Sequence, residues 1–188
     1  TTRRALRQEF KAAEVMDLRA PTVAPGRLRR DGAIEFFAAL PEADRARPRL
    51  IMGHMVFGLD AVIPRPAAYV TLMREPLKLI ASQFHHVKRH EGHILHEAAK
   101  AYPDLGSYVR SGISLEMDNS QTRAFAGDTT APFGGCTPAM FERAKANLAG
   151  SFAVAGLTER FDESLVLMQR AFGWRRLRYL SVNIDPGR

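Results

Sequence analysis

The sequence predicts an α/β fold in which parallel strands are buried between helices. Residues 49–52 and 67–73 are short, nearly continuous apolar runs, typical of strands buried on both faces of a sheet. Residues 152–173 read as a strand, a turn and a helix, and strands alternate with helices along the chain. With 188 residues, 46% hydrophobic and 25% charged, residues 1–188 are expected to form one globular domain.

The first elements follow from apolar spacing and from proline and glycine. Leu6, Phe10 and Ala13 recur at helical spacing and predict a helix over residues 3–15, with Thr1 or Thr2 at its N-cap. Prolines and a glycine break residues 20–30, which are expected to form a loop. Residues 33–40 are expected to form a short helix.

Both apolar runs end at polar residues. The first ends at Gly53-His54 and the second at Arg74, after which Pro76 opens a predicted helix. Later in the chain, helices are expected over residues 119–125 and 138–148, and a strand over residues 152–155. Thr158 is the expected N-cap of a helix over residues 161–172 that Gly173 ends, and residues 177–182 are a further strand candidate. Ligands of such sheets bind beyond the carboxyl ends of the strands, where His54, Arg74 and Thr158 are placed.

Charge and cysteine content narrow the partners and the compartment. A formal net charge of +7 favours an anionic partner, either a nucleotide, a nucleic acid, an acidic polysaccharide or a lipid surface, although scattered basic residues also fit a solvated surface. The single cysteine, Cys136, cannot form an internal disulfide framework. Apolar stretches are too short for a membrane span, and the charges in residues 1–20 argue against an intact signal peptide. Cytosolic folding is therefore expected.

Arg74 and Ser82 form a candidate anion site at a strand-to-helix turn. The arginine offers a fixed fork of N–H donors, the serine offers a hydroxyl, and the start of the helix carries a partial positive charge. Together these groups suit a phosphate. The alternative is that Arg74 pairs with Glu75 and that Ser82 caps the helix or faces solvent.

Four blocks in order resemble the sulfotransferase family. Residues 71–82 are similar to the segment that binds the 3'-phosphate of 3'-phosphoadenosine 5'-phosphosulfate (PAPS), and residues 51–58 resemble the Gly-His segment of the 2-O-sulfotransferase branch. Residues 119–123, Asn-Ser-Gln-Thr-Arg, are similar to the Asn-x-Gln-Thr-Arg signature of that branch. Residues 144–148 and 154–165 resemble its late strand-helix unit.

The resemblance implies a three-layer, P-loop-type parallel sheet flanked by helices and a PAPS donor, with no metal. In this family His54 would be the general base, Arg74 and Ser82 would bind the 3'-phosphate, and Thr1 or Thr2 would donate to the 5' side. Arg123 would bind an anionic acceptor or the sulfuryl group, or else fix the helix over residues 119–125. The acceptor would be a hydroxyl, most simply of a carbohydrate, and the absence of an anchor favours a bacterial cytoplasm.

The sequence departs from the family pattern at two places. The family's first strand and its Pro-Lys-x-Gly-x-Thr phosphate loop are not in this sequence, and the usual C-terminal basic loop and helix do not follow residue 188. The chain is therefore expected to be truncated at both ends. The alternative function is a catalytically inactive nucleotide- or glycan-binding protein of the same fold. Met52 stands where the heparan-modifying members have a second histidine, which leaves the acceptor class open.

The sequence also allows other hypotheses for a functional site. His86, His90 and His93 recur on one helical face and could bind zinc, although a solvated polar face is favoured because the His-Glu-x-x-His pattern is incomplete. Cys136 lacks a motif for nucleophilic catalysis. A nucleic-acid-binding domain would need aromatic residues interleaved with the basic ones, but aromatics make up only 9% and are mostly Phe in apolar stripes. We therefore expect no nucleic-acid partner.

Overall fold

The computed structural model describes residues 2–18 and 32–174. Its strands form two separate parallel pairs. Strand β1 (Val15–Leu18) pairs with β2 (Leu50–Gly53), and β3 (Tyr69–Met73) pairs with β4 (Phe152–Leu157). The chain is thus a mixed α/β protein with short parallel strands, as the apolar runs predict.

The N-terminal helix is shorter than its apolar spacing predicts. Helix α1 spans Thr2–Arg7, a 3₁₀ turn follows at Ala12–Glu14, and the chain then enters β1. The prediction of one helix over residues 3–15 is wrong at its C-terminal half, and β1 itself was missed. The reason is non-local, because β1 is held in register along β2 rather than by contacts within its own segment. This pairing is close: a Cβ at Gly53 would lie 2.6 Å from the carbonyl oxygen of Leu18.

Two short helices separate β1 from the later strands. Helix α2 (Ala33–Ala38) confirms the helix expected over residues 33–40, and α3 (Glu42–Ala46) follows it. A 3₁₀ turn, Leu59–Val62, lies between β2 and β3. The loop expected over residues 20–30 and the strand expected over residues 177–182 lie outside the residues that the structure describes.

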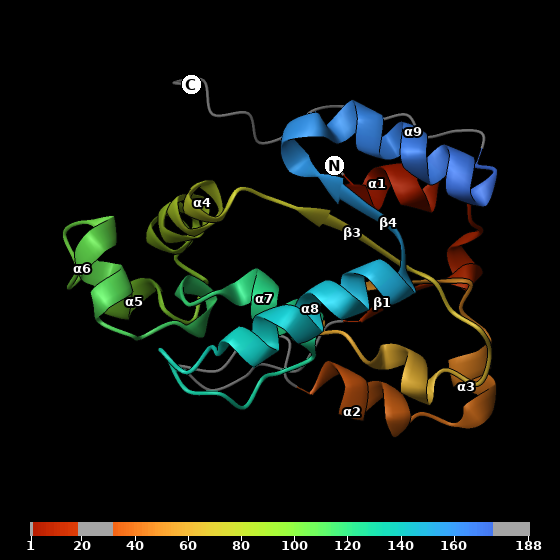
Figure 1. The fold of residues 1–188 in the computed structure, drawn as a ribbon, viewed down its shortest axis with the longest axis horizontal. Coiled ribbons are helices and arrows are strands. Elements are labelled where there is room, and N and C mark those ends of the chain that lie inside the picture. The colour runs from red at the N-terminus through yellow and green to blue at the C-terminus, as the bar shows by residue number, and fades with distance from the viewer. Residues whose placement is uncertain (1, 19–31, 175–188) are drawn as a thin grey trace.

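Helix α4 (Pro76–Arg89) leaves the end of β3, as predicted, and leads into a small helical lobe. The lobe contains α5 (His96–Ala99) and α6 (Leu105–Arg110), which the sequence analysis did not anticipate, and the 3₁₀ turn Leu115–Met117. In Figure 1 this lobe lies at the left, away from β3 and β4. It has its own hydrophobic core, made of Phe84, Val87, Leu95, Ala99, Tyr108 and Met117.

The C-terminal half follows the predicted order. Helices α7 (Ser120–Ala126) and α8 (Pro138–Ser151) precede β4, and α9 (Phe161–Phe172) ends at Gly173, whose φ of 66° is the left-handed conformation that glycine tolerates. The N-cap prediction for Thr158 is wrong. Residues Thr158–Arg160 form a 3₁₀ turn after β4, and the N-cap of α9 is Arg160.

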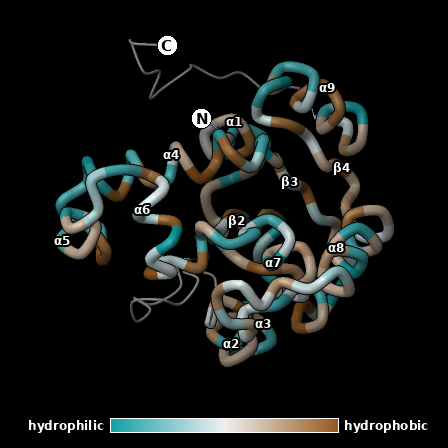
Figure 2. Tube along the Cα trace, turned by 60° about the vertical axis from the view of Figure 1, so that its left-hand side comes forward, coloured by the Kyte–Doolittle hydropathy of each residue, from teal (hydrophilic) through white to brown (hydrophobic). Residues whose placement is uncertain are grey.

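Helices cover β3 and β4 from two sides. Figure 1 shows α1 and α9 on one side of these strands and α7 and α8 on the other. Polar and apolar residues both occur along α9 in Figure 2, and its buried residues Leu165 and Met168 pack against Val154 of β4. The same cluster contains Leu6 of α1 and Met52 of β2, so one hydrophobic cluster joins α1 and both strand pairs.

A cavity of about 590 Å³ lies beside the two strand pairs. Its lining includes all of β2 and residues 69–71 of β3. Within the described residues, β2 pairs only with β1 and β3 only with β4. The free edges of two parallel strands therefore border one largely apolar cavity. Among the described helices, none combines the length and the apolar character needed to cross a lipid bilayer.

Candidate active site

The carboxyl ends of β3 and β4 bring Arg74 and Thr158 side by side. Met73 lies opposite Leu157 in the parallel register, so Arg74 and Thr158 are the residues that directly follow these two adjacent strands. A shallow depression at this edge is lined by Arg74, Lys78, Thr158 and Glu159. The structure thus brings together two of the three residues that the sequence places at strand ends.

Arg74 presents its guanidinium at this edge without a protein partner among the described residues. The residue is half-buried, and no hydrogen bond or ion pair of its guanidinium with another described residue is present. A guanidinium has five N–H donors in a planar fork that matches the oxygens of phosphate and sulfate. Arg74 is therefore equipped to bind an anion.

The start of α4 is already capped by a carboxylate. Glu75 Oε1 accepts from the Leu77 N–H at 3.0 Å, and Oε2 accepts from the Lys78 N–H at 2.6 Å. These hydrogen bonds lower the pKa of Glu75, and the one from Lys78 N has the larger effect. The carboxylate of Glu75 therefore already occupies two amides at the helix start that could otherwise bind an anion. An anion here would be bound by side chains.

Lys78 is a cation at this site that the sequence analysis missed. It lines the depression with Arg74, and Ser82 follows it by four residues on α4, so both lie on the same face of the helix. Ser82 is half-buried and one turn beyond Lys78. The i, i+4 spacing of Lys78 and Ser82 was visible in the sequence and could have identified Lys78.

Glu159 adds a negative charge to the same edge. Its Oε1 accepts from the backbone N–H of Glu75 at 3.2 Å, and its Oε2 accepts from the Thr158 hydroxyl at 3.1 Å. Burial alone would raise the pKa of Glu159, but hydrogen bonds from backbone N–H groups and from Thr158, with the charge of Lys78, lower it. The Ser164 hydroxyl fixes this turn by donating to Arg160 O at 2.8 Å and accepting from Leu157 N at 2.9 Å. The depression thus has two cations and one ionised carboxylate.

Gln121 of α7 contacts the backbone of Arg74. Its side-chain Oε1 accepts from Arg74 N at 2.8 Å, and its Nε2 donates to Arg74 O at 2.8 Å. The blocks over residues 71–82 and 119–123, which carry the family resemblance, therefore meet in space. Gln121 belongs to the Asn-x-Gln-Thr-Arg signature, but the sequence alone does not indicate its role.

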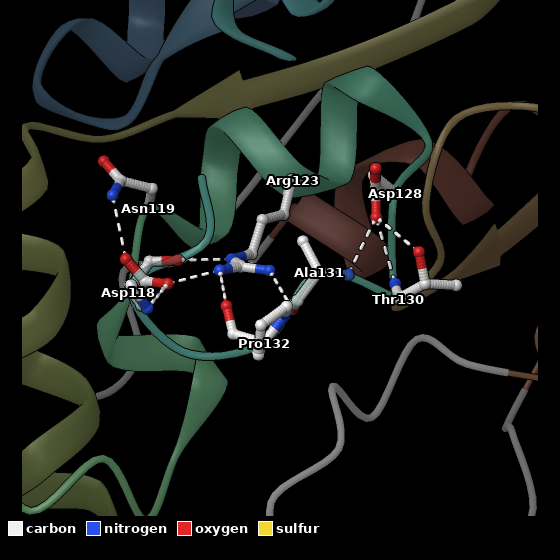
Figure 3. Close-up of polar contacts among 8 residues, drawn as sticks. Asp118, Asn119, Arg123, Asp128, Thr130, Ala131 and Pro132 are labelled. Atoms are coloured by element: carbon white, nitrogen blue, oxygen red, sulfur yellow. Dashed lines mark hydrogen bonds and ion pairs between the residues drawn. The ribbon is translucent and has the colours of Figure 1, made fainter. Parts of the chain in front are cut away.

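Arg123 lies away from this edge, in the interior. Its side chain is 0% exposed, and Nε donates to Asp118 O at 2.8 Å while the guanidinium pairs with the Asp118 carboxylate. Nη1 donates to Ala131 O at 2.6 Å and Nη2 to Pro132 O at 2.7 Å, as Figure 3 shows. The structure therefore does not present Arg123 to an acceptor. It supports the alternative that Arg123 fixes α7.

Asp118 is the anionic partner of Arg123. Burial would raise the pKa of Asp118, but the hydrogen bonds from Arg123, from the Gly134 N–H and from Asn119 outweigh it and lower the pKa. Asn119, before the helix, has a φ of 52°, a left-handed conformation that asparagine tolerates better than most residues. The first residues of the signature therefore build the start of α7.

His54 lies at the carboxyl end of the other strand pair. It follows Gly53, the last residue of β2, and is exposed. Three residues later, Phe57 N donates to Ala124 O of α7 at 2.7 Å. Of the two threonines expected near the donor, Thr1 lies outside the described residues and Thr2 is the first residue of α1.

The histidines of the predicted face lie at the end of α4 and just beyond it, and Cys136 is half-buried. The ring centroids of His86 and His90 are 4.0 Å apart, and those of His86 and His93 are 5.8 Å apart. Within residues 2–18 and 32–174, no group of three or more His, Cys, Asp or Glu side chains could hold a metal ion. Burial raises the pKa of the Cys136 thiol, which disfavours the nucleophilic thiolate.

The comparison with protein families agrees with the sulfotransferase resemblance. The chain is a sulfotransferase by family. Its residues 10–183 match the family model described as Galactose-3-O-sulfotransferase, and because the match covers most of the chain, the protein belongs to this family. The sequence motifs resemble the 2-O-sulfotransferase branch, whereas the matching family is described as Galactose-3-O-sulfotransferase. No curated protein matches the chain.

Proposed function

We propose that this protein transfers a sulfuryl group from PAPS to a hydroxyl of a carbohydrate that contains galactose. Membership of the sulfotransferase family supports the reaction class. The family's description supports the galactose acceptor and leaves 3-O as the position of transfer to be tested. The observation that carries the proposal is Arg74, a half-buried guanidinium without a partner among the described residues, at the shared end of β3 and β4.

The side chains at this edge fit the 3'-phosphate of the donor. Arg74 would bind two phosphate oxygens through its fork, and Ser82 would donate its hydroxyl from the next turn of α4 beyond Lys78. Lys78 and Thr158 add an ammonium and a hydroxyl that line the same depression. Glu159 opposes the anion, so the site favours a ligand whose charge is large enough to engage both cations.

His54 is the proposed general base. As the acceptor oxygen bonds to sulfur, the bond between sulfur and the 5'-phosphate oxygen breaks, and the electron pair leaves with the adenosine bisphosphate. The acceptor hydroxyl must lose its proton in this step, and a neutral imidazole nitrogen of His54 would take it. Such transfers depend on placement and charge stabilisation more than on covalent catalysis. Thr1 or Thr2 would donate to the 5' side.

The cavity beside β2 and β3 supports the three-layer sheet of the family. We propose that one further parallel strand lies there, between β2 and β3. Both free edges border the cavity, and one hydrophobic cluster includes residues of α1, β2 and β4. With neighbouring strands about 4.8 Å apart, the inserted strand would leave β2 and β3 about 10 Å apart. A phosphate loop after that strand would lie between His54 and Arg74, where it would meet the charge of the leaving group.

Calorimetric titration with 3'-phosphoadenosine 5'-phosphate tests the nucleotide site. In the full-length protein, Arg74→Ala should weaken binding by about 10- to 100-fold, because a charge-assisted hydrogen bond contributes about 1.5–3 kcal/mol. Ser82→Ala should weaken binding by about 3- to 10-fold for a neutral hydrogen-bond donor. Arg89→Ala, at the far end of α4, is the matched control. Equal affinities for wild type and Arg74→Ala would exclude this nucleotide site.

Measuring the turnover of variants tests whether His54 is the general base. His54→Ala should lower kcat by about 10²- to 10⁴-fold, the usual contribution of general base catalysis, and leave nucleotide affinity unchanged. His85→Ala, an exposed histidine of α4, serves as the control. Retained turnover in His54→Ala would exclude the assignment. Nucleotide or glycan binding without any turnover in the wild-type protein would favour the catalytically inactive alternative.

A further inference from the structure

The Gln121 side chain completes the hydrogen bonding of the chain just where β3 ends. Strand β3 stops at Met73, and at Arg74 the primary amide of Gln121 satisfies both the N–H and the C=O of the backbone, each at 2.8 Å. A side-chain amide has one acceptor and two donors, so it can replace the two backbone groups of a neighbouring strand. Gln121 therefore extends the pairing of the chain by one residue beyond β3.

The helix that carries Gln121 is firmly held. Arg123, two residues further on, is fully buried and has four acceptors around its guanidinium, from Asp118, Ala131 and Pro132. At the other end of α7, Arg143 Nε donates to Ala126 O at 3.0 Å and Asn147 Nδ2 donates to Phe125 O at 2.7 Å. Gln121 thus projects from an element fixed at both ends.

The backbone at Arg74 determines where its guanidinium lies. Arg74 stands between the last residue of β3 and Glu75, the N-cap of α4, and its own side chain has no hydrogen bond or ion pair with another described residue. The two contacts from Gln121 are the hydrogen bonds that hold the backbone of Arg74 itself. A long side chain held only through its backbone depends on that backbone for its direction.

We infer that Gln121 is a positioning residue that orients Arg74 for the phosphate of the donor. The inference rests on the proposed function and deepens it, because it gives the Gln of the Asn-x-Gln-Thr-Arg signature a physical role. Gln121 contacts the Arg74 backbone and acts through the arginine. The same helix accepts a hydrogen bond from Phe57 N, three residues after His54, so α7 contacts the segments that follow both β2 and β3.

The test compares two substitutions of Gln121 with a matched control. Gln121→Met keeps the length of the side chain but removes both hydrogen bonds. Gln121→Glu keeps the acceptor for Arg74 N and places an anion against Arg74 O. Gln169→Met, on α9, makes the same change at a half-buried glutamine whose side chain has no hydrogen bond with another described residue. Each full-length variant is titrated with 3'-phosphoadenosine 5'-phosphate, and the melting temperature is measured alongside.

We expect Gln121→Met to weaken nucleotide binding about 10-fold and Gln121→Glu to weaken it further, with Gln169→Met unchanged. Hydrogen exchange of the peptide that contains Arg74 should accelerate in both Gln121 variants. In Gln121→Met, Arg74 N loses its acceptor, and in Gln121→Glu the repulsion between the carboxylate and Arg74 O pushes the two groups apart. In turnover, KM for PAPS should rise more than kcat falls. A purely structural role would instead lower the melting temperature and leave the affinity of the folded protein unchanged.

Two outcomes overturn the inference, and they can be told apart. If the wild type binds the nucleotide, Arg74→Ala loses binding and Gln121→Met retains it, the inference fails while the proposed function stands. If the wild type does not bind the nucleotide at all, the proposed function fails and the inference falls with it.

Discussion

Arg74 and Arg123 are two arginines in contrasting environments. Arg123 is 0% exposed, and its guanidinium is bonded to one carboxylate and to three backbone carbonyls. These bonds hold the loop after α7 against the start of that helix. Arg74 is half-buried at the end of β3, and no described residue binds its guanidinium. Gln121, two residues before Arg123 on α7, bonds to the backbone of Arg74.

The contrast separates structural from ligand-binding arginines by their partners. A buried guanidinium whose donors all meet protein acceptors has no capacity left for a ligand, and its removal leaves a buried carboxylate unpaired. When a guanidinium without protein partners is removed, the folded protein loses no hydrogen bond or ion pair of that group. The two regions therefore predict opposite consequences for stability and for binding.

The largest expected effect is the loss of stability in Arg123→Met. Breaking a buried ion pair by removing one partner costs about 3–5 kcal/mol, because the Asp118 carboxylate remains buried. We expect urea unfolding to show this loss, whereas Arg74→Ala should change the free energy of unfolding by no more than about 0.5 kcal/mol.

Arg123→Met should also differ from Arg74→Ala in its affinity for the nucleotide. The folded fraction of Arg123→Met should bind 3'-phosphoadenosine 5'-phosphate within about 3-fold of wild type, since Arg123 does not reach the β3–β4 edge. Unfolding at wild-type denaturant concentrations, or a selective loss of acceptor binding in stable Arg123→Met, would contradict the structural assignment.

The pH dependence of stability sharpens the assignment of Asp118. Its pKa is lowered in the folded protein, so its contribution to stability is complete above its unfolded pKa of about 3.9 and is lost as pH falls through the folded value. Asp118→Asn removes the charge at every pH. The difference in unfolding free energy between wild type and Asp118→Asn should therefore be constant from pH 7 to about 4 and shrink below it. A difference that does not change with pH would mean that the Asp118 charge contributes nothing.

Much of the fold near the site was predictable from local signals. The apolar runs predicted β2 and β3, Pro76 predicted the start of α4, and Gly173 predicted the end of α9. These features depend on residues close together in sequence. Strand β1 was missed because its stability comes from pairing with β2, which lies about 35 residues away and which no local spacing reveals.

The site was predictable in its positions and less so in its contacts. Arg74 and Thr158 could be placed at strand ends from sequence, and the structure brings them together through the register of β3 and β4. The capping of α4 by Glu75 and the burial of Arg123 depend on side-chain directions. Arg123 in particular needs two carbonyls from a loop eight and nine residues away, and composition and spacing do not show where those carbonyls point.

The smallest expected effect concerns the charges around Arg74. Lys78→Met should weaken binding of 3'-phosphoadenosine 5'-phosphate, and Glu159→Gln should strengthen it, each by about 2- to 5-fold, the range for exposed charges. Glu159→Gln keeps an oxygen that can accept from Glu75 N, and its amide nitrogen can donate to the Thr158 hydroxyl oxygen, so the change removes the charge while both contacts can persist. Both differences should shrink when titrations are repeated at 0.5 M salt, because exposed charges are screened.

The opposite signs of these two substitutions make the prediction specific to this edge. Glu142→Gln and Lys145→Met, an exposed pair on α8 with a nitrogen-to-oxygen distance of 2.9 Å, change charge in the same way at a distance from Arg74 and serve as controls. If the controls shift affinity as much as Lys78→Met and Glu159→Gln do, the anion responds to the net charge of the protein. Shifts confined to Lys78 and Glu159 would place the phosphate beside Arg74, because only nearby exposed charges act through water and salt.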